Sequence, residues 1–476
     1  MAVVRMKVLD KQEENLVHEQ SLKNLNEIGV LIRSQSVLRM LDESGAIVDY
    51  ETGIAKFPES MAKEALVKAP KRFKLCGRDP KNDLELPADG GAPYISTDGL
   101  TVYMRDIDTG EKRSATRKDL ADFAKLADAL DAINFFWPIV TVSDVPEEAH
   151  STHEMWTSLQ GCAMHVQGMS LNRMDAATEI DLAALIVGGK EELKKRPIFS
   201  VIHCSISPLS FEKGLVEAHV ELAKAGIPIV SMSMSLSGMS SPVTFAGTIV
   251  NLNTENLASL IITQFAEPGA PHIYCSESAP IDMLTGNMNY SAPEMLPISA
   301  AAGQMARRYS LPSMVGSWGI GGEGFDVRIS PGLIAFSLMR VFCNTDLTCG
   351  FGGLDNSLGC SLEQMVIDSY QWVDFWALMR DFTLSEKTIA LDVVKEVGHG
   401  NSFLTHPHTA KNFKKELFFR DKKKLAWDAI PSTKIAQEAR KIAKKLKNEH
   451  EVTPIDRDII RQGDELISEY EKKLSS

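Results

Sequence analysis

Short apolar segments alternate with longer segments of helical pattern between about residue 130 and residue 380. Seven of the apolar segments have the length of a strand, and they begin at Ile133, Ala163, Pro197, Pro228, Pro271, Pro312 and Thr345. Buried strands that alternate with helices predict a parallel sheet with both faces covered. The repeat of roughly 35 to 45 residues predicts an α/β fold, a (β/α)8 TIM barrel of about 250 residues. The eighth strand is expected near Ile95 or after Arg380.

An open, doubly wound sheet is the alternative fold for this pattern. In that fold a GxGxxG turn follows an early strand, and the chain has no such motif there. Capping chemistry also places helix starts after the strands. The residues that mark these starts are Ser241 before Pro242, Ser291 with Glu294, and Ser361 with Gln364. The barrel is therefore the preferred prediction.

The pattern divides the chain into three parts. Residues 1–92 are predicted to form a mostly helical extension, with a small β segment near Phe73. Residues 93–385 are the barrel and the expected catalytic domain. Residues 386–476 are more polar, and we expect a helical tail that packs on the barrel, with an exposed helix from Ser432.

Composition and charge exclude several classes of protein. The formal net charge of −12 argues against a nucleic-acid groove, which needs a basic face. No apolar run approaches the ~20 residues of a membrane span, and the first residues lack the apolar core of a signal peptide. Seven cysteines without a CxxC pair indicate a reducing compartment, so we expect a cytoplasmic protein.

The active site of a barrel lies at the C-terminal ends of its strands. The residues that follow the predicted strands are Asn172, His203, Ser205, Met239, Glu277, Asn287, Trp318, Phe325, Phe351 and Asp355. This set is rich in small, sulfur-containing and aromatic side chains and poor in converging charge. Each residue alone has an ordinary structural explanation, and the set as a whole carries the prediction.

The sequence contains no signature of a zinc site or of a serine nucleophile. His150 and His153 lie three residues apart at a predicted helix start, but neither HExxH nor paired CxxC motifs occur. GxSxG is also missing, and "SMSMSLSGMSS" from Ser231 is typical of a buried strand that ends in a turn. We therefore expect no metal in the site.

A rim of rings and small polar groups suits a ligand that needs little proton transfer. A quaternary ammonium is such a ligand, because aromatic faces attract it by about 1–2 kcal/mol per desolvated ring. The rings expected to supply this contact are Tyr94, Phe136, Trp137, Trp318, Phe325 and Phe351. Packing in the core is the competing explanation for each of them.

Four stretches resemble the trimethylamine methyltransferase superfamily. They begin "YISTDGLTVYM" at Tyr94, "SGMSSPVTFAG" at Ser237, "GFGGLDNSLGC" at Gly350 and "HPHTAKNF" at His406. The resemblance implies a barrel whose upper face docks a separate corrinoid protein. It also implies that cob(I)alamin on that partner takes a methyl group from the amine in one SN2 step.

Within that superfamily the chain is similar to members that lack pyrrolysine, and the nearest subgroup is the glycine betaine:corrinoid protein methyltransferases. A glycine-rich stretch lies where the resemblance places pyrrolysine in other members of the superfamily. The resemblance therefore implies that Gly319, Gly321 and Gly322 face the corrin. A quaternary amine leaves as a neutral tertiary amine without a proton donor. The enzyme then needs only to hold the cation and align one methyl group.

The predicted reaction converts glycine betaine to dimethylglycine. The candidate partners for the betaine carboxylate are Asn172, His203, Asn287 and Arg328. A zinc-dependent corrinoid methyltransferase with another donor, a non-catalytic betaine-binding protein and a lyase on the same barrel stay open as alternatives. A symmetric homo-oligomer is the default expectation for the assembly.

Overall fold

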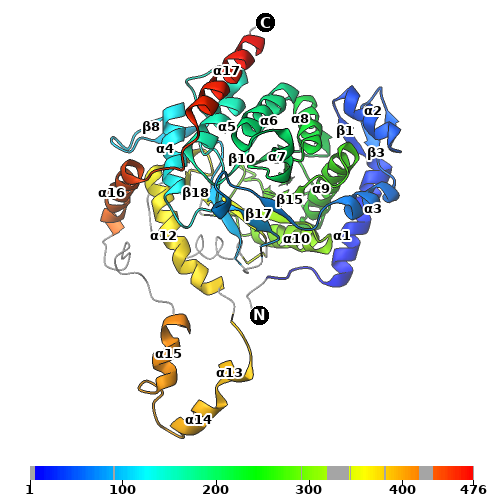
Figure 1. The fold of residues 1–476 in the computed structure, drawn as a ribbon. Helices are drawn as coiled ribbons and strands as arrows, with labels where there is room; N and C mark the ends of the chain where they lie inside the picture. Colours follow the sequence, from blue (N-terminus) through cyan, green and yellow to red (C-terminus); the bar gives the residue numbers. More distant parts are fainter. Residues whose placement is uncertain are drawn as a thin grey trace.

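The centre of the computed structural model is a closed barrel of eight parallel strands (Figure 1). The structure describes residues 6–88, 92–290, 292–318, 342–343, 345–379, 382–416 and 432–474. Around the barrel the strands are β10 (His165–Gly168), β11 (Phe199–Cys204), β13 (Ile229–Ser233), β15 (His272–Ser276), β17 (Ser313–Ser317), β18 (Leu347–Phe351), β6 (Tyr94–Thr97) and β9 (Phe135–Phe136). They match the seven predicted segments and the eighth strand expected near Ile95. The predicted TIM barrel is confirmed.

The side chains of each barrel strand alternate between the interior and the helices outside. Ile202, Val230 and Ile273 are paired in register on neighbouring strands and share one interior apolar cluster. Val201 and Ile229 belong instead to the cluster under the outer helices. This two-residue period explains why the strand sequences are apolar almost throughout, since both faces of a covered parallel sheet are buried.

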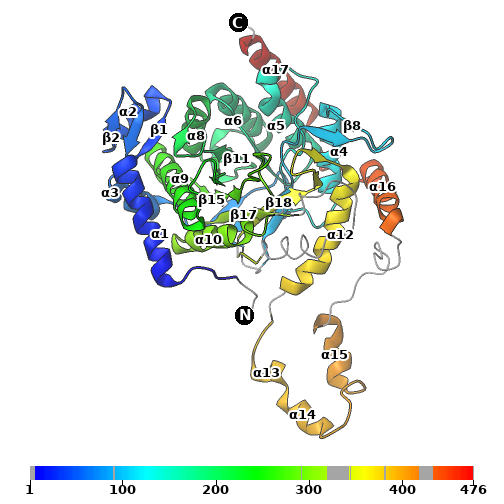
Figure 2. The same cartoon turned by 180° about the vertical axis from the view of Figure 1, so that it is seen from behind.

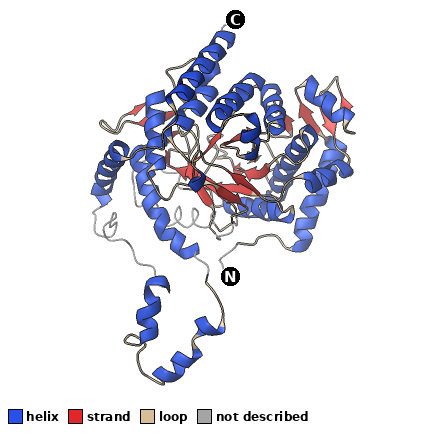
Figure 3. Ribbon diagram, viewed as in Figure 1, coloured by secondary structure: helices blue, strands red, loops and turns tan. Residues whose placement is uncertain are grey.

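Helices follow the strands and surround the barrel, as the colouring by secondary structure makes plain (Figure 3). They are α4 (Arg117–Asp128), α5 (His150–Gly161), α6 (Arg173–Val187), the short α7 (Lys190–Lys195), α8 (Lys213–Lys224), α9 (Phe245–Ala266), α10 (Met295–Arg308) and α12 (Leu362–Met379). Most of α9 is buried because it lies between the barrel and the N-terminal helices.

The N-terminal segment packs against α9 on the side of the barrel, and its hairpin reaches the interior cluster. Its elements are α1 (Lys11–Lys23), a π turn (Asn24–Ile28), β1 (Val30–Ile32), α2 (Gln35–Glu43), β2 (Ile47–Asp49), β3 (Ile54–Lys56) and α3 (Glu59–Lys68). β12 (Ser210–Phe211), which follows β11, joins its small sheet. The hairpin β4 (Phe73–Leu75) and β5 (Leu84–Leu86) places three leucines in the interior cluster. This hairpin confirms the β segment expected near Phe73.

The C-terminal helices fall into two groups (Figures 1 and 2). α13 (Glu386–Ile389), α14 (Leu391–Val397) and α15 (Pro407–Glu416) stand apart from the barrel. α16 (Ser432–Glu449) packs on α12 and α17 (Arg457–Leu474) packs on α6. The helix predicted from Ser432 is exposed on one face only, because Ile435, Ala439 and Ala443 are buried on the other.

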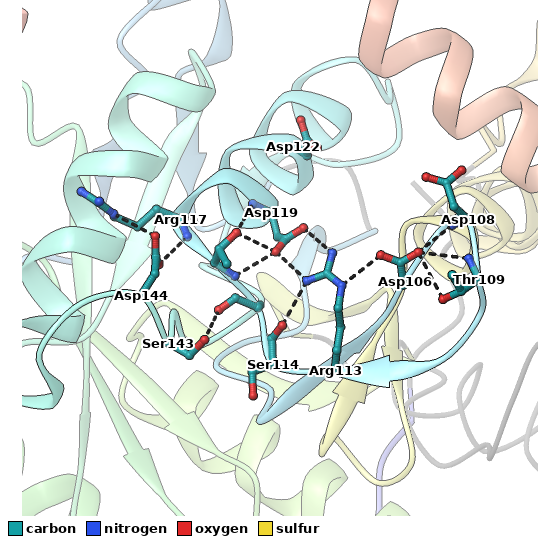
Figure 4. A network of polar contacts seen from close by, with 12 residues as sticks. Asp106, Asp108, Thr109, Arg113, Ser114, Arg117, Asp119, Asp122, Ser143 and Asp144 are labelled. Carbon is teal, nitrogen blue, oxygen red and sulfur yellow. Dashed lines mark hydrogen bonds and ion pairs between the residues drawn. The ribbon is translucent and has the colours of Figure 1, made fainter.

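An arginine ties a hairpin beside the barrel to the start of α4 (Figure 4). The hairpin consists of β7 (Tyr103–Arg105) and β8 (Lys112–Arg113). The Arg113 guanidinium donates to Asp106 Oδ2 at 2.9 Å and to both Asp119 oxygens at 2.7 and 2.8 Å. Asp119 also completes a capping box with Thr116, so one carboxylate fixes both the helix start and the hairpin.

Four further short strands lie in the loops that follow the barrel strands. They are β14 (Leu236–Ser237) with β16 (Ala279–Pro280), and β19 (Gly353–Leu354) with β20 (Gly359–Cys360), which pairs with β7. These ladders hold the loops at the carboxyl end of the barrel. No helix in the described ranges is long and apolar enough to cross a membrane.

The predicted helix caps are partly right. Ser361 Oγ accepts from Gln364 N at 2.9 Å at the start of α12. The expected cap at Ser241 was wrong: Thr244 caps α9, and its hydroxyl accepts from Gly247 N. Ser241 instead hydrogen-bonds Thr248 in the first turn. Ser291 lies outside the described residues.

Candidate active site

A cavity of about 170 Å³ lies at the carboxyl end of the barrel. Its walls come from strand ends and from the loops that follow them, and the lining residues are Asp98, Gly99, Leu100, Trp137, Met169, Ile202, Cys204, Met232, Met234, Glu277, Tyr290, Ser317, Cys349 and Ser357. Every barrel strand supplies at least one of these positions, either within the strand or just after it. The location is the one at which barrel enzymes bind their substrates.

Two carboxylic acids give the cavity its polarity. Asp98 directly follows β6, is 3% exposed, and accepts a hydrogen bond from Ser357 Oγ at 2.6 Å. Burial raises the pKa of Asp98 to about 6. Glu277 follows β15 and is 6% exposed. Among the described lining residues there is no lysine, arginine or histidine.

The rest of the lining is aromatic or sulfur-containing. Trp137 is fixed through its backbone, because the Thr97 hydroxyl bonds to both the amide nitrogen and the carbonyl oxygen of Trp137 at 3.0 and 2.6 Å. Gly99 lies against the indole: a Cβ at Gly99 would sit 2.1 Å from Trp137 Cε2. Tyr290 and three methionines complete a wall of polarisable groups.

Strand alternation decides which neighbours reach the cavity. On β11, Ile202 and Cys204 line it, whereas His203 between them faces outward. His203 stacks on Phe211 at 5.8 Å and meets the His219 ring edge at 4.5 Å. Burial lowers the pKa of His203 to about 4, so this imidazole is neutral at physiological pH.

Of the predicted substrate-binding residues that the structure describes, Trp137 alone lines the cavity. Tyr94 begins β6 and packs at the amino end of the barrel interior. Phe136 points to the helices, because its neighbour Phe135 faces inward. Trp318 and Phe351 also face outward; they pack with Trp372 at 5.4 and 5.9 Å.

The predicted polar partners lie elsewhere. Asn172 caps α6 through its side-chain oxygen, which accepts from Met174 N and Asp175 N. Asn287 is exposed in the loop before α10. Trp318 Nε1 donates to Asp368 Oδ1 at 3.1 Å, on the helix side of the barrel wall. Phe325, Arg328, Gly319, Gly321 and Gly322 lie outside the described residues.

Apart from Trp137 and Glu277, the rest of the lining was not among the residues predicted from the sequence. Glu277 was among the residues that follow strands, but only as part of that general set. Asp98 gave a signal as well, since it ends the run "YISTD" that starts the barrel. Met232 and Met234 alternate with serines in "SMSMS", a period-2 pattern that could have assigned them to one face.

His153, one of the two histidines at the predicted helix start, and His406 both make ordinary contacts with carboxylates. His153 Nε2 lies 2.9 Å from Glu471 Oε1, and His406 Nε2 lies 3.0 Å from Glu396 Oε2. Among the residues that the structure describes, no three His, Cys, Asp or Glu side chains are grouped as metal ligands.

The fold and cavity define a class of protein, a TIM-barrel protein with a small acidic and aromatic pocket at the carboxyl end of its strands. Residues 2–474 match the family model described as trimethylamine methyltransferase (MTTB). The chain belongs to this family of methyltransferases.

Individual relatives agree with that assignment. The chain is 29% identical over 476 residues to the trimethylamine methyltransferase MttB of Methanosarcina barkeri, covering 98% of this chain and 96% of that protein. It is 28% identical over 429 residues to a glycine betaine methyltransferase of Desulfitobacterium hafniense, covering 86% and 85%. Among solved structures, the monomethylamine methyltransferase MtmB of Methanosarcina barkeri superposes with a TM-score of 0.56 at 12% identity, covering 93% and 89%. That likeness concerns the fold.

Proposed function

We propose that this methyltransferase binds a quaternary amine in the cavity at the carboxyl end of the barrel. It then transfers one of the methyl groups of the amine to the reduced cobalt of a corrinoid on a partner protein. The observation that carries the proposal is the pairing of Asp98 and Glu277 with Trp137 in one small pocket. Carboxylates and an aromatic face both stabilise a cation that carries no hydrogen-bond donor.

The residues of the pocket suit a displacement that needs positioning more than proton transfer. In the reaction the N–CH3 bond breaks, nitrogen keeps the electron pair and leaves as a neutral tertiary amine, and the methyl group bonds to cobalt(I). Asp98 and Glu277 would hold the ammonium, and the methionine wall of Met169, Met232 and Met234 would exclude water. No residue is required to donate a proton.

The surface around the cavity supports a protein partner on this face. Large apolar side chains are exposed on the loops after the strands and at the start of α9: Val102, Leu171, Ile206, Met239, Val243, Phe245, Met283, Leu284 and Leu358. Val243 and Met283 both approach the Cβ position of Gly238 to 3.6 Å, so they gather in one patch. Such a patch beside a cavity suits docking of the corrinoid protein.

We propose glycine betaine as the methyl donor, and one of the relatives is named a glycine betaine methyltransferase. Asn172, His203 and Asn287 lie away from the cavity, so they do not support a carboxylate clamp. The betaine carboxylate would then point away from Asp98 and Glu277, toward the opening. A protonated tertiary amine such as trimethylamine is the rival donor, because its N–H can donate to either carboxylate.

The test is a donor panel with reduced free or protein-bound cobalamin, followed by the loss of cobalt(I) absorbance. Glycine betaine, choline, tetramethylammonium and trimethylamine would be compared with unmethylated glycine as the control. We expect cobalt(I) loss with glycine betaine, dimethylglycine as the product by mass spectrometry, and no effect of a chelator. Turnover of trimethylamine alone would overturn the quaternary-amine assignment. Binding of betaine without cobalt(I) loss would indicate a binding protein, and activity restored by zinc after chelation would indicate the metal-dependent alternative.

A further inference from the structure

A buried glutamate on α9 gathers five hydrogen bonds beside the cavity without lining it. Glu255 is 1% exposed. Its carboxylate accepts from Ser205 Oγ at 2.6 Å, Ser207 Oγ at 2.8 Å, Leu209 N at 2.9 Å, Ser233 Oγ at 2.6 Å and Asn251 Nδ2 at 3.0 Å. A carboxylate only accepts, so it can satisfy several donors at once.

Two of these donors, Ser205 and Ser233, lie at the ends of the strands β11 and β13, which form one wall of the cavity. Ser205 directly follows Cys204, and Ser233 stands between Met232 and Met234. Cys204 and both methionines line the cavity. Because neighbouring side chains on a strand point in opposite directions, the serines that face Glu255 turn these three sulfur side chains toward the cavity.

The same contact continues along α9 as a polar seam. Thr248 Oγ1 meets Ser237 Oγ at 2.7 Å, Asn251 Nδ2 donates to Ser235 Oγ at 2.8 Å, and Glu255 accepts from Ser233. The helix residues are three and four apart and the serines two apart. One helical turn of about 5.4 Å thus spans roughly the rise of two strand residues, about 6.6 Å. The seam fixes the strand against sliding by one residue.

We propose that Glu255 is a positioning residue that sets the methionine and cysteine wall of the substrate cavity. The expected change in KM rests on the proposed function. The expected change in the structure of the cavity wall does not. Without the carboxylate, three serine hydroxyls, the Leu209 amide N–H and the buried Asn251 side chain lose their acceptor, and the strand ends beside the cavity rearrange to satisfy them.

The experiment compares Glu255→Gln with Glu217→Gln. Glu217 on α8 also accepts from serines, Ser34 Oγ at 2.7 Å and Ser36 Oγ at 3.5 Å, but it does not line or border the cavity. The first measurement is the rate at which a small thiol reagent labels Cys204, followed by mass spectrometry. Cys204 is the half-buried cysteine, and the other six are buried. This readout needs no turnover.

We expect Glu255→Gln to label Cys204 at least about fivefold faster than the unmodified protein and to raise the KM for glycine betaine about tenfold with a smaller change in kcat. Glu217→Gln should leave both within about twofold. A folded Glu255→Gln protein that labels Cys204 at the original rate would overturn the proposal. If Glu255→Gln does not fold by circular dichroism, Ser233→Ala, which removes one donor, gives the same two-way test. If the unmodified protein consumes no cobalt(I), the labelling result still decides the role of Glu255.

Discussion

The hydroxyl of Ser317 donates to Glu277 Oε2 at 3.4 Å, so the ends of β17 and β15 meet at one carboxylate in the wall of the cavity. Glu277 thus holds the ends of two barrel strands together in the wall of the cavity. The position of Glu277 therefore gives the most direct test of the cation site.

Glu277→Gln keeps the size of the side chain and removes its charge. We expect the KM for a quaternary donor to rise about 10- to 100-fold, the range of a lost hydrogen bond or ion contact to a charged group. Steady-state kinetics of cobalt(I) loss would measure it, with Glu217→Gln as the matched change away from the pocket. An unchanged KM would show that Glu277 does not contact the ammonium.

The pH dependence should report Asp98. Its pKa is raised by burial to about 6, so the carboxylate that we propose as a partner of the cation is progressively protonated below that pH. A quaternary amine keeps its charge at every pH. We expect the KM to rise as the pH falls below 6, by up to about tenfold per pH unit, and Asp98→Asn to remove that dependence. A pH profile that is identical in Asp98→Asn would assign the titration to another group.

The same shift has a consequence for stability. The folded protein holds the Asp98 proton up to about pH 6, whereas an unfolded aspartate loses it near 3.8. The folded state therefore binds more protons between these values, and the contribution of Asp98 to stability falls as the pH rises from 4 to 6. Urea unfolding at pH 5 and pH 8 should show a smaller pH-dependent loss in Asp98→Asn than in the unmodified protein.

The barrel could be predicted from the sequence because its signal is repeated. Seven buried strands and their helices each leave an apolar pattern, and errors in single caps, such as Ser241, do not change the count. The side chains in the cavity could not be predicted in the same way. On a strand such as β9, where both faces are buried and the residues are all apolar, the sequence does not show which side chains face the interior.

Two strands make this limit concrete. On β11 the sequence pattern favours His203 as a polar group, yet the register of the barrel turns Ile202 and Cys204 inward. On β9, Phe135 faces inward and Phe136 outward, although their residue types are identical. Asp98 follows a strand of four residues whose short pattern did not define its end.

Trp137 is expected to provide the aromatic face of the site. Trp137→Leu keeps an apolar side chain but removes the ring, and we expect the KM for tetramethylammonium to rise about 5- to 30-fold, equivalent to 1–2 kcal/mol. Trp137→Phe should recover most of that loss because a ring remains. Equal kinetics of the leucine and phenylalanine variants would show that Trp137 acts by shape alone.

Gly99 should matter only through the indole above it. The backbone of Gly99 lies outside the left-handed region, so an alanine can adopt its conformation. The strain in Gly99→Ala comes from a steric clash of the new Cβ with Trp137. The new Cβ would stand 2.1 Å from Trp137 Cε2 and 2.2 Å from Cδ2, far inside contact distance, and the ring would have to move. We expect Gly99→Ala to lower kcat/KM for a quaternary donor by about as much as Trp137→Leu. In the double variant the two losses should not add, since a leucine leaves room for the methyl group; a double-mutant cycle of kcat/KM would show a coupling of about 1 kcal/mol or more. Additive losses would mean that Gly99 acts on the loop after β6 independently of Trp137.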